Sequence, residues 1–297
     1  MHIVDYKKIS FKILLTSFAI TCGIIGSLSF ENSFAHNFSP DESAEFLTTV
    51  DKIKIESAIV ANSSANNNQS SAISHAQYAL NTYDSHTNNE LSEKNERIAT
   101  ELNNTLNQLQ NQVETSSITD KSQINQIVET INAILEEAIS VRIDDDQLNN
   151  STIQALVFAD IVNTALQSYG IAFDIGIDLT NMSNMNTTTS STGNNTINNG
   201  HNNHELQTTF EQMSIINFTS YESAISFADY ALKKFNSDIK TSIQENTKTQ
   251  NYFKQLENGL LEFNTAIKNH ENPMKVMKIV HTKIHPNLQI LFTLKSK

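Results

Sequence analysis

Ser71-Ala-Ile-Ser-His-Ala-Gln-Tyr-Ala-Leu80 recurs later in the chain as Ser223-Ala-Ile-Ser-Phe-Ala-Asp-Tyr-Ala-Leu232, with eight of the ten positions identical. An aromatic residue follows each stretch at the same offset, Tyr83 in the first and Phe235 in the second. Apolar residues three and four positions apart predict that both stretches are helices with one buried face. Because such agreement is hard to obtain by chance, we interpret the chain as two related helical units.

The rest of the chain carries the same helical periodicity. Seven Gly and three Pro in 297 residues interrupt it rarely, and the alternation typical of strands is nearly absent. We therefore predict an all-α fold of two related four-helix, bundle-like units, residues 36–143 and 144–290, with a C-terminal tail, 291–297. In these units Leu80 and Leu232 are expected to be fully buried. The expected helices cover about residues 40–61, 70–84, 89–114, 120–141, 151–173, 220–236, 239–268 and 273–285.

Local signals mark some of the boundaries. Ser39, Pro40 and Glu42 have the spacing of a capping box at the start of the first helix. Residues 181–204 consist mainly of Asn, Thr, Ser and Gly and show no apolar periodicity. Such a segment buries too little apolar surface to offset its ordering entropy, so we predict a disordered insertion in the second unit.

The N-terminus has the features of a signal peptide. Three Lys among the first twelve residues precede an uncharged, mostly apolar run, Ile13 to Phe30, and then Ser33-Phe34-Ala35. Small residues at both positions that a signal peptidase reads predict cleavage after Ala35, which makes residues 1–35 the signal peptide. The alternative is an uncleaved anchor, because the apolar run is just long enough to span a bilayer. We expect a secreted or extracytoplasmic, cell-surface-associated protein whose mature form contains no membrane span.

Charge and cysteine content exclude several classes of function. Cys22 is the only cysteine and lies in the signal peptide, so the mature chain has no disulfide and no thiolate ligand. The net charge of −12 argues against nucleic acid and anionic membranes as partners, because both select clustered Lys and Arg. The sequence has neither a Gly-rich phosphate loop nor a G-x-S-x-G elbow, and we expect no enzyme activity.

Asn-x-Ser/Thr sequons are frequent, and in an exported chain each is a potential glycan acceptor. A chain rich in Asn, Ser and Thr also produces them by chance, and we expect glycans in loops rather than on Asn103, inside a predicted helix. The sequons are at Asn37, Asn62, Asn68, Asn103, Asn149, Asn150, Asn181, Asn186, Asn194 and Asn217.

Histidines provide the candidate metal site. Cleavage after Ala35 leaves His36 at the N-terminus, where its α-amine and ring nitrogen suit Cu(II). His281 and His285 have the i, i+4 spacing that places two imidazoles on one helix face. Pro286 disfavours the α conformation at His285, so the alternative is a pair that caps a C-terminal turn.

His75 is the fourth candidate, because the matched position in the second unit is Phe227 and the fold therefore does not need an imidazole there. The alternative is a partly buried histidine with satisfied hydrogen bonds. Together the pattern predicts a transition metal, with copper favoured, bound by some combination of His36, His75, His281 and His285.

The sequence resembles exported helical proteins of ammonia-oxidising archaea. The resemblance rests on Ala35-His-Asn-Phe-Ser-Pro-Asp-Glu-Ser-Ala44, Ile53 to Glu56, Ser74-His-Ala76 and Val280-His-Thr-Lys-Ile-His-Pro-Asn-Leu288. It implies an extracytoplasmic helical protein in copper-rich physiology and implies no particular activity. A fainter similarity, to the extracytoplasmic helical regions of iron permeases, rests on Tyr169-Gly-Ile-Ala172 and Tyr221-Glu-Ser-Ala224 and implies no ligands.

Three functions are compatible with these features. The first is a non-enzymatic exported protein that binds copper through the four histidines. The second is a structural or adaptor protein of the cell surface whose helices bind another protein and whose sequons carry glycans. The third is a small-molecule sensor bundle, for which no fused signalling domain gives support.

Overall fold

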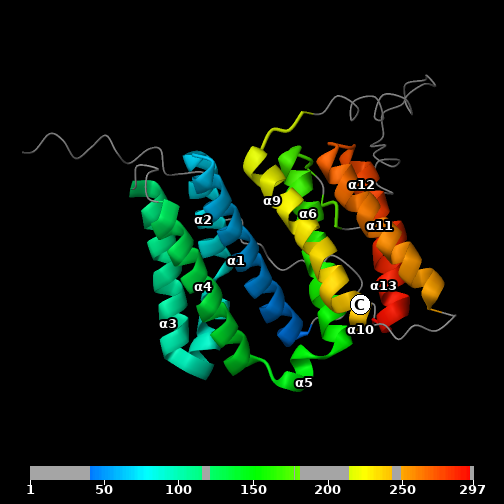
Figure 1. Cartoon of the computed structure of the whole chain (residues 1–297). Helices are drawn as coiled ribbons and strands as arrows, with labels where there is room; N and C mark the ends of the chain where they lie inside the picture. The colour runs from blue at the N-terminus through cyan, green and yellow to red at the C-terminus, as the bar shows by residue number, and fades with distance from the viewer. Residues whose placement is uncertain (1–40, 116–120, 177, 181–213, 243–248, 295–297) are drawn as a thin grey trace, which may run out of the picture. The chain divides into compact units, whose positions relative to one another are not determined.

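The computed structural model describes residues 41–115, 121–176, 178–180, 214–242 and 249–294. The chain divides into two units, 1–34 and 35–297, and every described residue lies in the second. Over these residues the structure consists of helices and their connections, without a strand (Figure 1), which confirms the predicted all-α class. The predicted signal peptide, His36 and the predicted insertion 181–204 lie outside the described residues.

The first half of the described chain forms a closed ring of four helices. These are α1 (Glu42–Ala65), α2 (Gln69–Thr82), α3 (Ser85–Thr115) and α4 (Lys121–Arg142). Each helix packs against the next, and α4 packs back against α1. Apolar residues at helical spacing fill the centre, as in α4, where the buried stripe runs from Ile124 to Ala138.

The second half repeats this ring with more interruptions. Helix α6 packs against α9 and α13, and α11 packs against the same two helices. The elements of this half are α5 (Asp145–Leu148), α6 (Ser151–Ala172), α9 (Phe218–Lys234), the π-helical segment η1 (Phe235–Ile239), α10 (Lys240–Ser242), α11 (Gln250–Lys268), α12 (Pro273–Ile279), the π-helical segment η2 (Val280–Ile284) and α13 (His285–Phe292).

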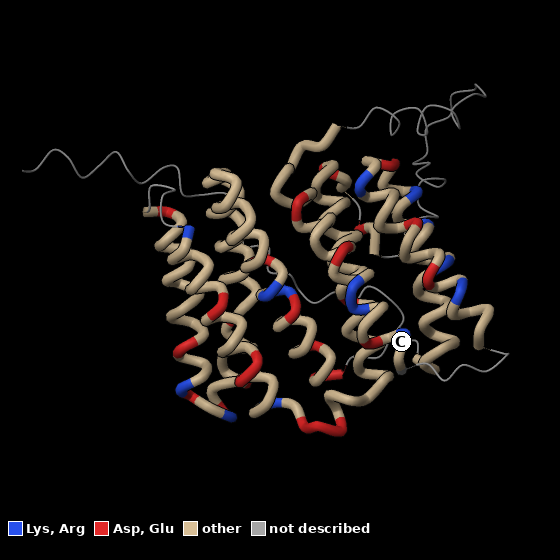
Figure 2. Tube along the Cα trace, in the orientation of Figure 1, with Lys and Arg blue, Asp and Glu red and all other residues tan. Residues whose placement is uncertain are grey.

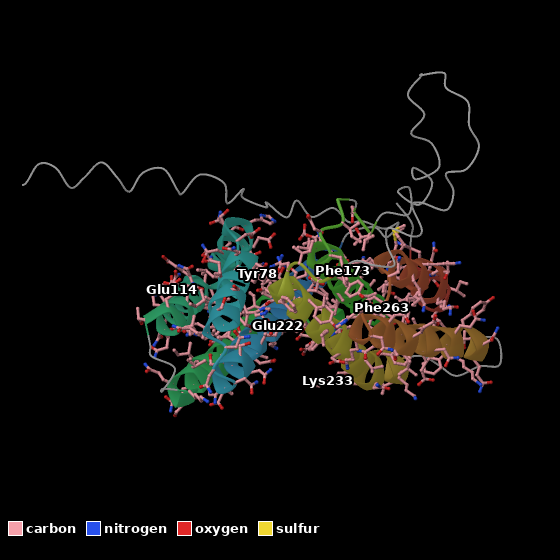
Figure 3. All side chains as sticks on the ribbon, turned by 90° about the horizontal axis from the view of Figure 1, so that it is seen from above. Tyr78, Glu114, Phe173, Glu222, Lys233 and Phe263 are labelled. Carbon is pink, nitrogen blue, oxygen red and sulfur yellow. The ribbon has the colours of Figure 1, made fainter. Side chains whose placement is uncertain are left out.

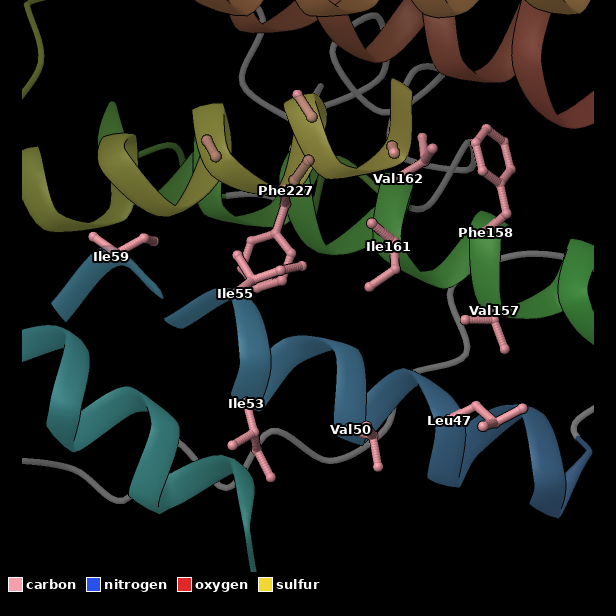
Figure 4. Packing of buried hydrophobic residues seen from close by; sticks show 14 of the residues in the cluster. Leu47, Val50, Ile53, Ile55, Ile59, Val157, Phe158, Ile161, Val162 and Phe227 are labelled. Atoms are coloured by element: carbon pink, nitrogen blue, oxygen red, sulfur yellow. The ribbon is translucent and has the colours of Figure 1, made fainter. Parts of the chain in front are cut away.

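Helix α1 is shared between the two rings, because it packs against α2 and α4 on one side and against α6 and α9 on the other. Its apolar residues accordingly do not form a single stripe. Val50 and Ile53 are buried, and so are Ile55 and Ile59, which lie on the side of α1 that faces α9 and its Phe227 (Figure 4). The buried apolar residues of both halves therefore form one continuous core.

The repeated stretch has the same environment in both halves. At all ten matched positions of α2 and α9 the pattern of buried, half-buried and exposed residues is identical. Leu80 and Leu232 are only partly buried, so the prediction of full burial was wrong. The fully buried positions beside them are Ala79 and Ala231, because small residues let these helices approach their neighbours closely and leave the leucines at the edge of the contact.

The starts of α1 and α11 differ from the sequence prediction in ways that the structure explains. The cap of α1 is Asp41, whose Oδ1 accepts a hydrogen bond of 3.0 Å from the backbone N–H of Ala44, so the predicted capping box on Ser39 is wrong. The predicted helix 239–268 is also wrong at its start. Helix α9 continues through η1 and α10, because Phe235 and Ile239 both belong to the core, and α11 begins only at Gln250.

The last helix ends at Phe292, whereas the sequence predicted an end near His285. Proline lacks the N–H that an α-helix interior needs, and its ring clashes with the preceding turn. The chain avoids this conflict by widening into η2, after which Pro286 occupies the first turn of α13, where proline is tolerated. The buried Leu288 and Phe292 then add to the core of the second half.

Close packing of α11 against η2 gives a testable prediction at Gly259. A Cβ atom added there would lie 2.8 Å from the Cβ of Lys283, which is too close without a shift of one helix. The expected gain in helix propensity from Gly259→Ala, up to about 1 kcal/mol, is smaller than the about 1–3 kcal/mol cost of overpacking. We therefore expect a lower free energy of unfolding in denaturant titrations.

Gly176→Ala is the matched control, because a Cβ atom added at Gly176 would meet open space, with nothing within 4 Å. Its effect should stay within about 0.5 kcal/mol of zero. Equal effects of the two substitutions would show that α11 and η2 are not held in close contact.

Candidate functional site

Among the described residues, the histidines predicted to bind a metal lie in two separate places. His75 lies on α2 and contacts carboxylates from α1 and α9. His281, in η2, and His285, at the start of α13, lie against each other, with ring centroids 5.6 Å apart. Among the described residues no group of three or more His, Cys, Asp or Glu side chains is arranged to hold a metal ion.

His75 is enclosed by two glutamates. Its Nδ1 lies 2.6 Å from Oε2 of Glu56, and its Nε2 lies 3.3 Å from Oε2 of Glu222. The imidazole is fully buried and Glu56 nearly so, whereas 37% of the Glu222 side chain is exposed. Because the two ring nitrogens point in opposite directions, the two carboxylates lie on opposite sides of the ring and do not share one ion with it.

Serines from the repeated stretch complete this cluster. Ser71 Oγ, on α2, donates to Glu222 on α9, and the equivalent Ser223 Oγ, on α9, donates to Glu56 on α1, both over 2.8 Å. Ser63 Oγ lies 2.7 Å from Ser71 Oγ and extends the network. Each matched serine thus binds a carboxylate from the other half of the chain.

We call Glu56, His75, Glu222, Ser71 and Ser223 the carboxylate–histidine cluster. Figure 3 marks Glu222 on α9 and Tyr78 on α2, the two helices that the cluster joins. The Tyr78 ring meets the edge of the His75 imidazole, with centroids 5.9 Å apart. The cluster ties α1, α2 and α9 together by buried hydrogen bonds, which contribute specificity as well as stability.

A second polar cluster lies between α1 and α9. Tyr230 donates to Oδ1 of Asp51 over 2.6 Å, and the Lys234 ammonium lies 3.5 Å from Asp51 and 3.1 Å from Asp238. Burial raises the pKa of the Asp51 carboxyl, although Lys234 and Tyr230 oppose this effect. Burial and the nearby Asp51 also raise the pKa of the Tyr230 hydroxyl. Both clusters place ionisable groups inside the contact between the halves.

The histidine pair of η2 and α13 has a different environment. His281 is buried, and its Nε2 lies 3.0 Å from the carbonyl oxygen of Leu179, to which a neutral ring donates. Burial lowers the pKa of His281, with the Leu179 carbonyl opposing the shift. Burial thus favours the neutral form of this ring, which is the form that a metal ligand needs, whereas the contact with the Leu179 carbonyl favours the protonated form.

Glu56 and Glu222 are the functional candidates that the sequence did not reveal. One signal for Glu56 was present, because α1 has apolar residues on several faces, so a polar residue among them is itself buried. No such signal exists for Glu222, which sits beside Tyr221 at the start of an ordinary amphipathic helix.

Comparison of the chain with protein-family models, with curated proteins and with solved structures gave no significant match. None of the helices in the described part of the chain combines the length and the apolar character needed to cross a membrane.

The lowered pKa of His281 predicts how stability depends on pH. The unfolded chain takes up a proton near the ordinary pKa of 6.5, whereas the folded chain takes it up only at lower pH. Between these two values the unfolded state binds more protons, so the free energy of unfolding falls as the pH is lowered, by about 1.4 kcal/mol for each unit of depression.

The substitution His281→Gln keeps a donor near the Leu179 carbonyl and removes the titration. We expect the variant to lose less stability than the wild type when the pH is lowered through this window, as measured by urea unfolding. The comparison at pH values above the window reports the packing effect of the substitution alone. The same dependence of the free energy of unfolding on pH in both proteins would contradict the lowered pKa of His281.

Proposed function

We propose that the chain is an exported, non-enzymatic helical protein that acts at the cell surface by binding another protein. Export is supported by the N-terminal basic and apolar segments and by Ser33-Phe34-Ala35. Along the described helices Lys and Arg are interspersed with Asp and Glu (Figure 2), a distribution that gives no support to nucleic acid as the partner.

The observation that carries the proposal is a group of exposed apolar side chains at one end of α6 and α9. Ile216 and Phe218 are each 68% exposed, and Ile171 is 37% exposed. The backbone N–H groups of Ile216 and Asn217 donate to the carbonyl oxygen of Ala172 over 2.8 and 3.1 Å, which holds the start of α9 beside the end of α6. We call Ile171, Ile216 and Phe218 the apolar patch.

The charge around the apolar patch indicates the kind of partner. Asp174, three residues after Ile171, is exposed, and Glu222 lies one helical turn after Phe218 and is partly exposed. The whole chain is also acidic, with a net charge of −12. A protein surface with apolar residues flanked by Lys or Arg therefore fits this end of the molecule best.

A retention assay tests the proposal. Purified chain beginning at His36 is added to cells that lack the protein, and the fraction that stays bound after washing is measured. The double substitution Ile216→Ser and Phe218→Ser should reduce retention about tenfold or more without changing the melting temperature, and added salt should weaken retention of the wild type.

Leu261→Ser is the control, because Leu261 is an exposed apolar residue of α11 outside the apolar patch. It should leave retention unchanged. Equal retention of the double variant and the wild type would refute binding through the apolar patch.

Glycosylation is compatible with this role. The sequon residues Asn62, inside α1 and not in the predicted loop, and Asn149, after α5, are exposed. Asn68, Asn150 and Asn217 cap helices through Oδ1, and because a glycan is attached to Nδ2, capping and glycosylation do not compete for the same atom. Asn103 lies within α3, as expected.

A second candidate function is binding of a transition metal, with copper favoured. The supporting observation is the contact between His281 and His285, whose ring separation of 5.6 Å is compatible with two imidazoles on one ion. His36 would serve as a further ligand through its α-amine and ring. His75 supports this function least, because each of its ring nitrogens faces a carboxylate.

Metal content of the mature chain tests this second candidate. Protein beginning at His36 is dialysed against copper and then against buffer, and bound copper is measured by mass spectrometry. His281→Ala and His285→Ala should each lower the copper content several-fold, and acidification should release the metal because protons compete for imidazole. His86→Ala, at an exposed histidine, is the control. Unchanged copper in the two site variants would exclude this pair as ligands.

A further inference from the structure

In the carboxylate–histidine cluster the buried His75 ring faces one hydrogen-bond acceptor more than a neutral imidazole can donate to. Both ring nitrogens of His75 contact carboxylate oxygens, and both contacts have hydrogen-bond geometry. A neutral imidazole has one N–H donor and one bare nitrogen, whereas a carboxylate offers only acceptors. Two such contacts therefore require two protons among Glu56, His75 and Glu222.

The simplest arrangement with two protons is an imidazolium between two carboxylates. The alternative, a neutral ring with one protonated carboxyl, leaves fewer charge-assisted hydrogen bonds. Ser71 and Ser223 favour the first arrangement, because each donates to one of the carboxylates and so stabilises its ionised form.

Apart from Glu56 and Glu222, the ionisable side chain that the described helices place against the His75 ring is Tyr78. Three helices pack against α2, namely α1, α3 and α9. Helix α1 contributes Glu56, α9 contributes Glu222, and the buried residues of α3 include no ionisable side chain. On α2 itself the adjacent ring is Tyr78. On α1, Lys54 pairs with Glu136 of α4.

The matched position in the second half shows that the fold itself does not need an imidazole here. Phe227 occupies the place equivalent to His75, is buried to the same degree, and packs beside Ile55 (Figure 4). In the repeat an apolar ring therefore fills the site without any proton. The contact that His75 makes depends on charge, whereas the contact of the equivalent Phe227 is apolar and does not.

We propose that the carboxylate–histidine cluster is a proton-operated latch that holds α2 of the first half against α9 of the second. With two protons present, His75 bridges Glu56 and Glu222. When one proton is lost, a bare ring nitrogen faces a carboxylate oxygen, and the contact becomes repulsive. Glu222 is the partner that leaves, because its side chain is partly exposed and its contact of 3.3 Å is the longer one, whereas Glu56 is buried and lies 2.6 Å from the ring.

The latch requires neither a partner protein nor a metal, although Glu222 and the first turn of α9 also border the apolar patch. It needs only the described contacts between α1, α2 and α9. Release of Glu222 would loosen the first turns of α9 and the facing turns of α2, while α3, α4 and α11 would keep their contacts.

The state of the ring is measured directly by nitrogen NMR on the full mature chain with labelled histidine, with His75 assigned by its absence in His75→Phe. Both ring nitrogens of His75 should carry protons under conditions in which the latch is closed. A ring that carries a single proton at every pH at which the wild type is folded would overturn the proposal.

Amide hydrogen exchange measures the latch itself. As the pH is raised, exchange in the first turns of α9 and the facing turns of α2, corrected for the intrinsic rate, should accelerate about tenfold when the latch opens. Amides of α11 should show no such change. The exchange transition and the loss of the ring proton should coincide.

Glu222→Gln is the decisive variant. Its amide group supplies the donor that a neutral ring lacks, so the contact with Nε2 persists with one proton fewer. The variant should therefore keep slow exchange at high pH and lose the pH-dependent transition. Glu137→Gln is the control, because Glu137 forms an exposed ion pair with Arg97 on α3 and should leave the transition as in the wild type. A transition that survives in Glu222→Gln would refute the latch.

Discussion

Helix α1 packs against four other helices, and this burial is the constraint on which the rest of the structure depends. A helix inside a protein has few places where its polar side chains reach water, so each of them needs a partner on a neighbouring helix. Asp51 finds Tyr230 and Lys234 on α9, and Glu56 finds His75 on α2 and Ser223 on α9. The two rings of helices are therefore joined by polar contacts as well as by a common apolar core. Replacing such groups singly would leave a buried charge unpaired, which is far more costly than the loss of an exposed ion pair.

The repeated stretch explains why these contacts come in a reciprocal form. Ser71 and Ser223 occupy the same position of the repeat, and each donates to a carboxylate from the other half. The two helices have the same pattern of burial, yet two of the ten matched positions differ in chemistry: the buried pair His75 and Phe227, and the exposed pair Gln77 and Asp229. The two matched helices thus present two similar faces, and His75 places an ionisable group at a buried position where the matched helix has an apolar one. The separate pair His281 and His285 depends on another local feature, the widening of the last helix before Pro286.

Sequence reasoning predicted the helical class and most helix positions, because apolar spacing is a local property that each helix carries by itself. It overestimated the burial of Leu80 and Leu232, since periodicity identifies the inner face of a helix but not how close the neighbour approaches at each residue. It missed the continuation of the last helix because Pro286 is read as a stop, whereas a π-helical turn accommodates it. Of the candidate site it identified His75 as unusual from the comparison with Phe227 and predicted a metal ligand there, but it did not reveal the two carboxylates that the ring contacts.

The sequence by itself determined that the described chain is all-α, that two of its helices share a nearly identical stretch, and that His75 is one of the two positions at which the stretches differ. Those conclusions follow from residue order alone, because helical periodicity and local identity do not depend on distant contacts. Only the tertiary structure decided that α1 lies between the two halves and that Glu56 and Glu222 meet His75 from opposite sides. Glu222 follows His75 by 147 positions in the chain, and no local pattern encodes such a pairing. It arises from the packing of α9 against α1 and α2, which brings groups together that are unrelated in sequence.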